Sequence, residues 1–250
     1  MHQDVPFPRS TSSTGPRQQA TLARPFERSG RSLHSGRHAT VRVSPAPAGH
    51  GIVFRRHLKD GRAVDVPAHW HYRESQPLSS ALRRDGVLVR TIEHLMASLS
   101  ALRIDNVLAE IDADELPIFD GSATPWCEAI RIAGRREQSL PCRVIRLLRT
   151  VAVENGRRRL EIEPGPGLHI TGHVALAHFG SIDWSGAITP ESFERGDRAG
   201  AQLRALRAGH GGPRLRLPDA ERLPAGRLAP ARQRCWCAGT SWAGCASPAS

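Results

Sequence analysis

The stretch Thr91-Ile-Glu-His-Leu-Met-Ala-Ser-Leu-Ser-Ala-Leu102 combines an apolar periodic pattern with an acid and an imidazole at its start. Its large apolar side chains recur at the spacing of one helix face: Leu95, Met96, Leu99 and Leu102. This spacing predicts a helix over residues 92–102 with Glu93 and His94 in its first turn. A neutral imidazole can hold zinc, and a neighbouring carboxylate can take a proton from metal-bound water. The pair suits a zinc hydrolase, although a histidine at a helix start is more often a surface or capping residue.

The segments around this helix alternate with the period of β-strands. Residues 39–43 and 51–55 predict two strands, joined as a pair by the turn Pro45-Ala-Pro47. Downstream, residues 106–111 predict a further strand, and residues 125–133 predict a second helix with a proline near its first position. This mixture of elements predicts an α+β fold.

The rest of the chain divides by composition. Residues 143–154 and 158–163 alternate around Asn155-Gly156, a dipeptide typical of hairpin turns, so a second β-rich unit begins near Leu140. Residues 196–250 contain no Ile, Val, Phe, Tyr, Met or Lys and have little with which to build a core. We therefore expect four parts: a disordered tail over 1–20, a first domain over 21–139, a partial second domain over 140–195 and a disordered tail over 196–250.

The length and composition limit the classes of protein to which this chain can belong. With 250 residues, 39% of them hydrophobic, the chain can bury a core and is long enough to be an enzyme. The five cysteines form no CxxC pair, so neither a zinc ribbon nor a disulfide framework is indicated. The sequence has no apolar run of about 18 residues and no signal-peptide core near its start. We expect a cytoplasmic protein without a transmembrane segment.

Six segments carry a resemblance to a known enzyme family: Ser32-Leu-His-Ser-Gly36, Pro45-Ala-Pro47, Gly51-Ile-Val-Phe-Arg-Arg56, Thr91-Ile-Glu-His-Leu-Met96, Ile104-Asp-Asn106 and Leu116-Pro-Ile-Phe-Asp-Gly-Ser122. In this order and spacing they resemble the UDP-3-O-acyl-N-acetylglucosamine deacetylases, the zinc amidases of lipid A biosynthesis. The resemblance covers about residues 20–195. Six collinear motifs are far more specific than any one of them.

The resemblance implies a fold, a reaction and roles for residues. The fold has two domains, each a sheet layered against a helix pair, with the active site between the domains. The reaction is hydrolysis of the N-acetyl group of UDP-3-O-acyl-N-acetylglucosamine, with Zn²⁺ as cofactor. His94 matches one of three zinc ligands and Glu93 matches the general base. His34 can lie near the substrate or be an ordinary turn histidine. We expect a monomer.

Other polar residues of these motifs have structural explanations. Asp105 and Asn106 are expected to cap or turn the chain between helix and strand. Asp120-Gly121-Ser122 is expected to form a tight turn that caps the second helix. Two sets of histidines lack the spacing of metal ligands and are expected to be solvated: His69 and His71, and His38, His50 and His57.

The resemblance also implies three features after Arg195 that this sequence does not contain. They are an Ala-Arg-Thr-Phe-Gly segment, a His-Lys-x-x-x-Asp segment with two zinc ligands, and a final histidine that acts as general acid. The only histidine after Arg195 is His210, and catalytic zinc needs about three protein ligands. Before this point, Ala175-Leu-Ala-His-Phe179 stands where the family has Asp-Phe-x-His-Pro. We expect deacetylase activity to be impaired or absent in this chain.

A frameshift is our hypothesis for this departure. The codons of Gly200-Ala-Gln-Leu-Arg204, read one nucleotide later, permit Ala-Arg-Ser-Phe-Gly, which is nearly the expected family segment. The shift would fall near residues 195–200, where the composition changes.

The alternative is a non-catalytic basic protein that binds nucleic acid or an anionic membrane through its arginine-rich tail. The formal net charge is +11, of which nine arginines and three acids in residues 196–250 supply +6. Only Trp236 and Trp242 offer aromatic platforms there, and no nucleic-acid module is recognised. We therefore expect no nucleic-acid partner.

Overall fold

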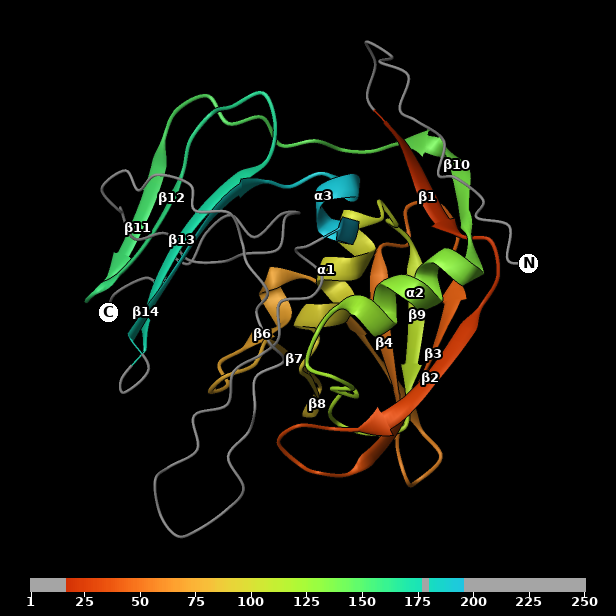
Figure 1. Ribbon diagram of the computed structural model, residues 1–250. Coiled ribbons are helices and arrows are strands. Elements are labelled where there is room, and N and C mark those ends of the chain that lie inside the picture. Colours follow the sequence, from red (N-terminus) through yellow and green to blue (C-terminus); the bar gives the residue numbers. More distant parts are fainter. Residues whose placement is uncertain (1–16, 177–179, 196–250) are drawn as a thin grey trace, which may run out of the picture.

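The structure, a computed structural model, describes residues 17–176 and 180–195. The elements of the larger, first part are β1 (Gln18–Leu22), β2 (Phe26–Arg31), β3 (His38–Pro45), β4 (Ile52–His57), β5 (Ala63–Pro67), a 3₁₀ turn (Trp70–Tyr72), β6 (Arg73–Glu74), β7 (Ala81–Arg84), β8 (Val87–Arg90), α1 (Glu93–Ala101), β9 (Val107–Ile111), α2 (Thr124–Ala133) and β10 (Arg135–Pro141). The second part holds β11 (Val151–Asn155), β12 (Arg158–Ile162), β13 (His169–Leu176), β14 (Gly180–Ala187) and α3 (Pro190–Arg195). The predicted α+β class is confirmed (Figure 1).

A five-stranded sheet with the order β2-β3-β9-β4-β5 forms the base of the first part. The expected pairing of residues 39–43 with 51–55 is wrong, because β9 lies between β3 and β4 and runs parallel to β4. The amide of Gly51 donates to Oδ1 of Asn106 at 2.7 Å, and the amide of Val107 donates to the Gly51 carbonyl at 3.0 Å. These bonds tie the start of β4 to the start of β9. The Pro45-Ala-Pro47 segment contains no dipeptide that favours a two-residue hairpin turn, so nothing local pairs β3 directly with β4.

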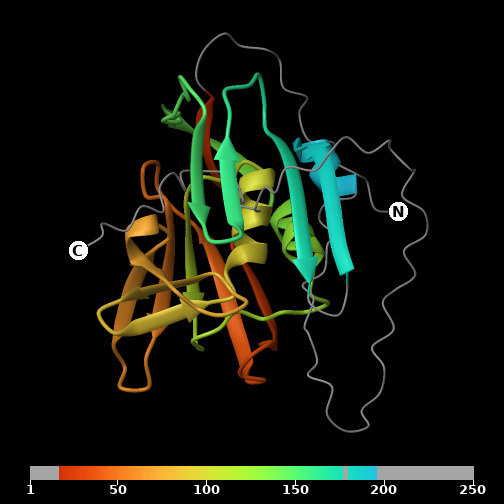
Figure 2. The ribbon, with the colours of Figure 1, turned by 90° about the vertical axis from the view of Figure 1, so that its left-hand side faces the viewer.

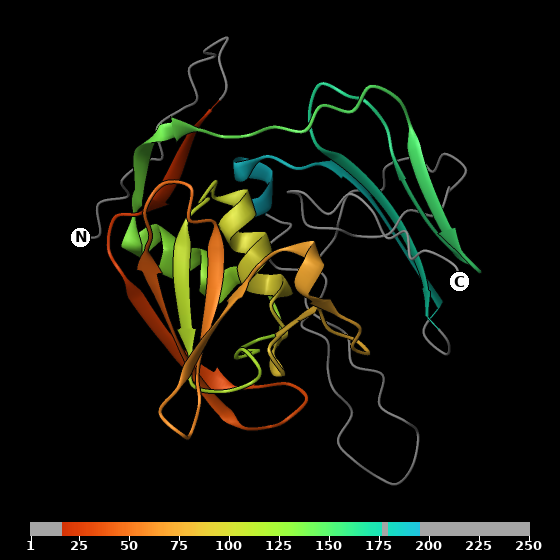
Figure 3. The same cartoon turned by 180° about the vertical axis from the view of Figure 1, so that it is seen from behind.

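Helices α1 and α2 cover one face of this sheet, as the views from the front and from behind both show (Figures 1 and 3). The two predicted helices are confirmed with boundaries shifted by no more than one residue. Fully buried side chains from both layers fill the space between them: Val41, Phe54, Leu95, Leu99, Trp126 and Ile130. Burying such side chains contributes about 1.5–3 kcal/mol each. The apolar face read from the sequence is therefore the face that holds α1 on the sheet.

The prediction of a disordered tail over residues 1–20 is wrong at its end, because strand β1 includes residues 18–20. This strand begins at Gln18 and pairs antiparallel with β10, so residues 18–20 belong to the folded part. Asp105 explains this local order, because it accepts two bonds from the Arg17 guanidinium at 2.7 and 2.8 Å and one from the Ala20 amide at 2.8 Å. Residues 1–16 and the predicted tail over 196–250 lie outside the described residues.

The second part consists of two hairpins and a short helix. The predicted Asn155-Gly156 turn is confirmed, since β11 and β12 pair across it and Gly156 has φ +58°. The first strand begins at Val151, whereas the alternation predicts a start at Arg143; residues 143–150 belong to no strand. Strand β13 pairs with β14, and Figure 2 shows both hairpins beside the helix layer. Because β10 continues to Pro141, we propose that the domain boundary lies within residues 142–150 rather than at 139.

None of the helices within residues 17–176 and 180–195 is long and apolar enough to span a bilayer.

Candidate active site

Glu93 is the first residue of α1, and its carboxylate is held by the loop that precedes β7. The backbone amide of Ser80 donates to Oε2 of Glu93 at 3.0 Å, and the Ile92 amide donates to the Ser80 carbonyl at 3.4 Å. A carboxylate in the first turn also lies in the favourable field of the helix N-terminus. Glu93 is partly buried, so part of its side chain remains exposed to solvent.

His94 follows on the next helical position and is partly buried. Burial lowers the pKa of its imidazole, and the opposing charge of Asp120 does not cancel this effect. The ring is therefore biased toward its neutral form, which is the form that binds a metal ion.

The turn at Asp120 has the structural role expected of it. Oδ1 of Asp120 accepts from the amide and the hydroxyl of Ser122, both at 2.9 Å, and the Ser122 hydroxyl accepts from the Thr124 amide at 3.1 Å. These bonds fix the start of α2. The charge of Asp120 also acts on His94, an effect that no pattern in the sequence indicates. Asp105 and Asn106 have structural contacts of a different kind from the local cap or turn expected of them, because Asp105 accepts from the Ala20 amide and Asn106 from the Gly51 amide.

His34 contacts the carboxylate of Glu115, a residue that the sequence analysis did not single out. Its backbone amide donates to Oε1 of Glu115 at 2.8 Å, and its ring Nδ1 lies 2.9 Å from the same oxygen. The Ser35 amide donates to Oε2 of Glu115 at 2.9 Å, and the Thr91 hydroxyl donates to Oε1 at 3.2 Å. Glu115 therefore connects the His34 turn to Thr91, which precedes Glu93 by two positions. The only sequence signal was its place directly before the Leu116-Pro117 motif.

Glu115 is ionised despite complete burial. Desolvation raises its pKa, but hydrogen bonds from the amides and side chains of His34 and Ser35 outweigh that effect and lower the pKa to about 2. Arg90 Nη2 lies 3.5 Å from Oε2 and adds an opposite charge.

The described residues do not form a complete zinc site. Within residues 17–176 and 180–195 no group of three or more His, Cys, Asp and Glu side chains could hold a metal ion. His94 offers one imidazole, whereas catalytic zinc needs about three protein ligands.

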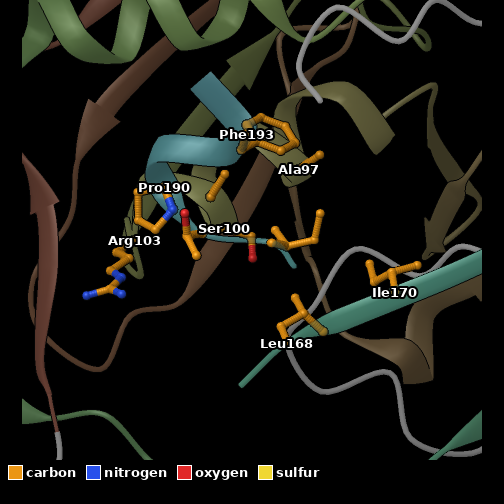
Figure 4. Close-up of a pocket in the computed structure, with 10 residues that line it drawn as sticks. Ala97, Ser100, Arg103, Leu168, Ile170, Pro190 and Phe193 are labelled. Carbon is orange, nitrogen blue, oxygen red and sulfur yellow. The ribbon is translucent and has the colours of Figure 1, made fainter. Parts of the chain in front are cut away.

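An apolar pocket of about 130 Å³ lies next to this part of α1 (Figure 4). Ala97 and Ala101 line it, three and seven positions after His94 and hence on the same helix face. Residues from both sides of the proposed domain boundary complete the lining: Ser100, Arg103, Leu168, Ile170, Ile188, Thr189, Pro190 and Phe193. The second part of the chain thus packs against the helix that carries Glu93 and His94.

The chain is similar in sequence to one family of enzymes. The family model described as "LpxC: UDP-3-O-acyl N-acetylglycosamine deacetylase" matches residues 19–197. A UDP-3-O-acyl-N-acetylglucosamine deacetylase from Myxococcus xanthus is 40% identical over 160 residues, which are 64% of this chain and 51% of that protein. A protein of the same name from Teredinibacter turnerae is 38% identical over 64% of this chain and 52% of its own length.

A third relative, from Solibacter usitatus, carries the same name and is 36% identical over 70% of this chain and 59% of its own length. The chain thus spans about half the length of the curated relatives it matches. The matched region contains His34, Glu93, His94 and Glu115, and it covers more than half of the 250 residues. The chain therefore belongs to the UDP-3-O-acyl N-acetylglycosamine deacetylase family.

Proposed function

We propose that this chain represents a zinc-dependent amide hydrolase that removes the N-acetyl group of UDP-3-O-acyl-N-acetylglucosamine in lipid A biosynthesis. The observation that carries the proposal is the pair at the start of α1, where a held carboxylate stands beside an imidazole biased toward neutrality. Family membership and the names of the matched relatives supply the substrate.

Glu93 is the proposed general base. In amide hydrolysis a water molecule attacks the acetyl carbonyl and must lose a proton as the C–O bond forms. The Ser80 amide holds the Glu93 carboxylate in one orientation, which suits it to accept that proton. As the C–N bond breaks, the leaving nitrogen takes up a proton, which balances the proton that Glu93 accepted from water, so that acetate is released and the sugar keeps a free amine.

His94 is the proposed zinc ligand and His34 the proposed substrate contact. Zn²⁺ remains the proposed cofactor, toward which the described residues contribute one imidazole. His34 keeps about one fifth of its side chain exposed, so a ligand can reach it. We further propose that the protein works in the cytoplasm as a monomer. The relatives reported above are all named as deacetylases, so the alternative of a nucleic-acid-binding or membrane-binding protein finds no support there.

The first experiment measures zinc content and acetate release for the purified chain as it stands. We expect little of either, because the described residues hold no complete ligand set and His210 is the only histidine after Arg195. Stoichiometric zinc with turnover, lost in His94→Ala but kept in the exposed control His71→Ala, would show instead that the site is complete in this chain.

The second experiment uses a gene from which one nucleotide is removed directly before the Gly200 codon. We expect its product to bind about one zinc ion and to release acetate from the UDP-sugar. Glu93→Gln should then keep the metal and lose about 10²–10⁴-fold in turnover, whereas His94→Ala should lose the metal. Full turnover by Glu93→Gln would contradict the proposed role of Glu93 as the general base.

A further inference from the structure

Glu115 is a buried carboxylate that the proposed reaction does not use. Its side chain is fully buried and accepts hydrogen bonds from three residues in two segments of the chain: the His34 amide and ring, the Ser35 amide and the Thr91 hydroxyl. All of these partners precede Glu115 in the chain, His34 and Ser35 by 81 and 80 positions and Thr91 by 24 positions. A single charged group therefore fixes two segments that meet near the start of α1.

The hydrogen bond to His34 determines which ring nitrogen carries the proton. An ionised carboxylate can only accept, so Nδ1 of His34 must donate across the 2.9 Å contact. In a neutral ring, Nε2 then carries a lone pair. No hydrogen bond or ion pair of Nε2 is found in the described part of the chain, and 21% of the side chain is exposed.

The bond to Thr91 stabilises an unusual backbone conformation. Thr91 has φ +59°, which is rare for a residue branched at Cβ. Two backbone bonds flank it, from the Arg90 amide to the Asp114 carbonyl at 3.0 Å and from the Leu116 amide to the Arg90 carbonyl at 3.1 Å. Such conformations persist where the surroundings fix them, and they are frequent at functional sites. The conformation of Thr91 sets the direction in which Glu93 and His94 leave β8.

We propose that Glu115 is a positioning residue of the active site, which fixes the Nδ1–H tautomer of His34 and the left-handed turn at Thr91 together. His34 then presents Nε2 as an acceptor for a hydroxyl group of the sugar substrate, beside the Glu93-His94 pair. The identity of that donor rests on the proposed function. The tautomer and the turn do not.

The test begins with the full 250-residue chain labelled with ¹⁵N-histidine. Long-range ¹H–¹⁵N spectra at about pH 8, where unperturbed imidazoles are neutral, assign the protonated nitrogen of His34. We expect Nδ1–H with Nε2 unprotonated, and the Nε2–H tautomer would overturn the proposal. This spectrum needs neither zinc nor substrate, so its failure is separate from a failure of the proposed deacetylase function.

Variants then separate positioning from simple loss of a buried charge. Glu115→Ala removes the acceptor, and we expect the ratio of Nδ1–H to Nε2–H tautomers to fall about tenfold or more, with changed amide shifts at Thr91 and Glu93. Glu115→Gln retains one acceptor oxygen and should keep the Nδ1–H tautomer. Asp114→Asn is the matched control, because Asp114 pairs with Arg90 at 3.3 Å but has no bond to His34.

An unchanged His34 tautomer in a folded Glu115→Ala variant would overturn the proposal, as would a tautomer change in Asp114→Asn. If Glu115→Ala does not fold, the wild-type and Glu115→Gln spectra decide, since both must show Nδ1–H. Adding UDP-N-acetylglucosamine to the full chain should shift the Nε2 resonance of His34 more than that of His71, which is exposed elsewhere on the surface. Equal or absent shifts would overturn the assignment of the donor as a sugar hydroxyl.

Discussion

The backbone amide of Ser80 and the carboxylate of Glu93 are joined by a 3.0 Å hydrogen bond across thirteen positions of the chain. The Ile92 amide returns a bond to the Ser80 carbonyl at 3.4 Å, so the loop before β7 and the start of α1 hold each other. Ile92 caps α1 without a side-chain hydrogen bond, which leaves Glu93 as the acidic group at this helix end. The same side chain thus stabilises the helix and is the proposed base.

Replacing Glu93 tests this structural contribution directly. We expect Glu93→Ala to lower the free energy of unfolding by about 1 kcal/mol, through loss of the Ser80 bond and of the charge at the helix N-terminus. Glu93→Gln should cost less, because its amide oxygen can still accept. The measurement is urea unfolding at neutral pH. Glu128→Ala in α2, at an exposed position, is the control and should change the free energy by less than about 0.5 kcal/mol.

Glu115 predicts a pH dependence of stability. Its pKa is about 2 in the folded chain, against 4.5 for an unperturbed glutamate. Because the folded-state value is the lower one, its stabilising effect is complete above about pH 5 and is lost as the pH falls toward 2. The full effect amounts to about 3 kcal/mol.

Urea unfolding of wild type and Glu115→Gln at several pH values measures this difference. We expect the gap between the two proteins to shrink steadily as the pH falls from about 5 to about 2. A gap that stays constant over this range would contradict the assignment of an ionised Glu115. Asp114 is next to Glu115 in sequence and also pairs with Arg90. The free energy of unfolding of Asp114→Asn should follow that of the wild type over this pH range more closely than that of Glu115→Gln does.

Arg103 offers a stabilising substitution. It follows the C-cap Leu102 of α1 and has φ +56°. The Ile104 amide donates to the Leu99 carbonyl at 2.8 Å and the Arg103 amide to the Ser100 carbonyl at 3.1 Å, which is the bond pattern of a Schellman motif. Glycine adopts this backbone without penalty, so Arg103→Gly should raise the free energy of unfolding by about 1 kcal/mol. Arg103→Ala removes the same side chain and should bring no such gain. Equal stability of the two variants would argue against the left-handed conformation.

Asp105 is expected to hold β1 in place. Asp105→Ala removes the acceptor of Arg17 and of the Ala20 amide, and we expect a loss of about 1–3 kcal/mol. Limited proteolysis should also cut near Gln18 more rapidly in this variant. Asp60→Ala breaks a similar bond to Arg62, but both of those side chains are half or more exposed, so solvent screens the pair and its loss should cost much less than that of Asp105. A larger cost for Asp60→Ala than for Asp105→Ala would refute the assignment.

Local patterns in the sequence predicted the elements that depend on local interactions. The apolar spacing of Leu95 and Leu99 identified α1, and Asn155-Gly156 identified the β11–β12 hairpin, because helix faces and two-residue turns involve neighbours only a few positions apart. The six ordered motifs identified the family, which the model match over residues 19–197 supports.

Pairings between distant segments were not predictable in this way. Strand β9 enters between β3 and β4, and β1 joins β10 more than one hundred positions later in the chain. The alternation of apolar residues marks a strand but carries no information about its neighbour, since each strand offers the same backbone donors and acceptors. Hydrogen bonds to side chains, such as the bond from the Gly51 amide to Oδ1 of Asn106, favour one order of strands over another. They form only when the chain has folded.

The candidate site shows the same difference between local patterns and contacts of distant segments. The linear chain is enough to identify the helix that carries Glu93 and His94 and the family to which the chain is similar, since adjacency and motif order are properties of the sequence. Three contacts follow from the folded arrangement instead: Ser80 holds Glu93, Asp120 acts on His94, and Glu115 joins His34 to Thr91. They cannot be read from the sequence because desolvation and hydrogen bonding set the charge of a carboxylate or imidazole, and both depend on groups brought together from distant parts of the chain.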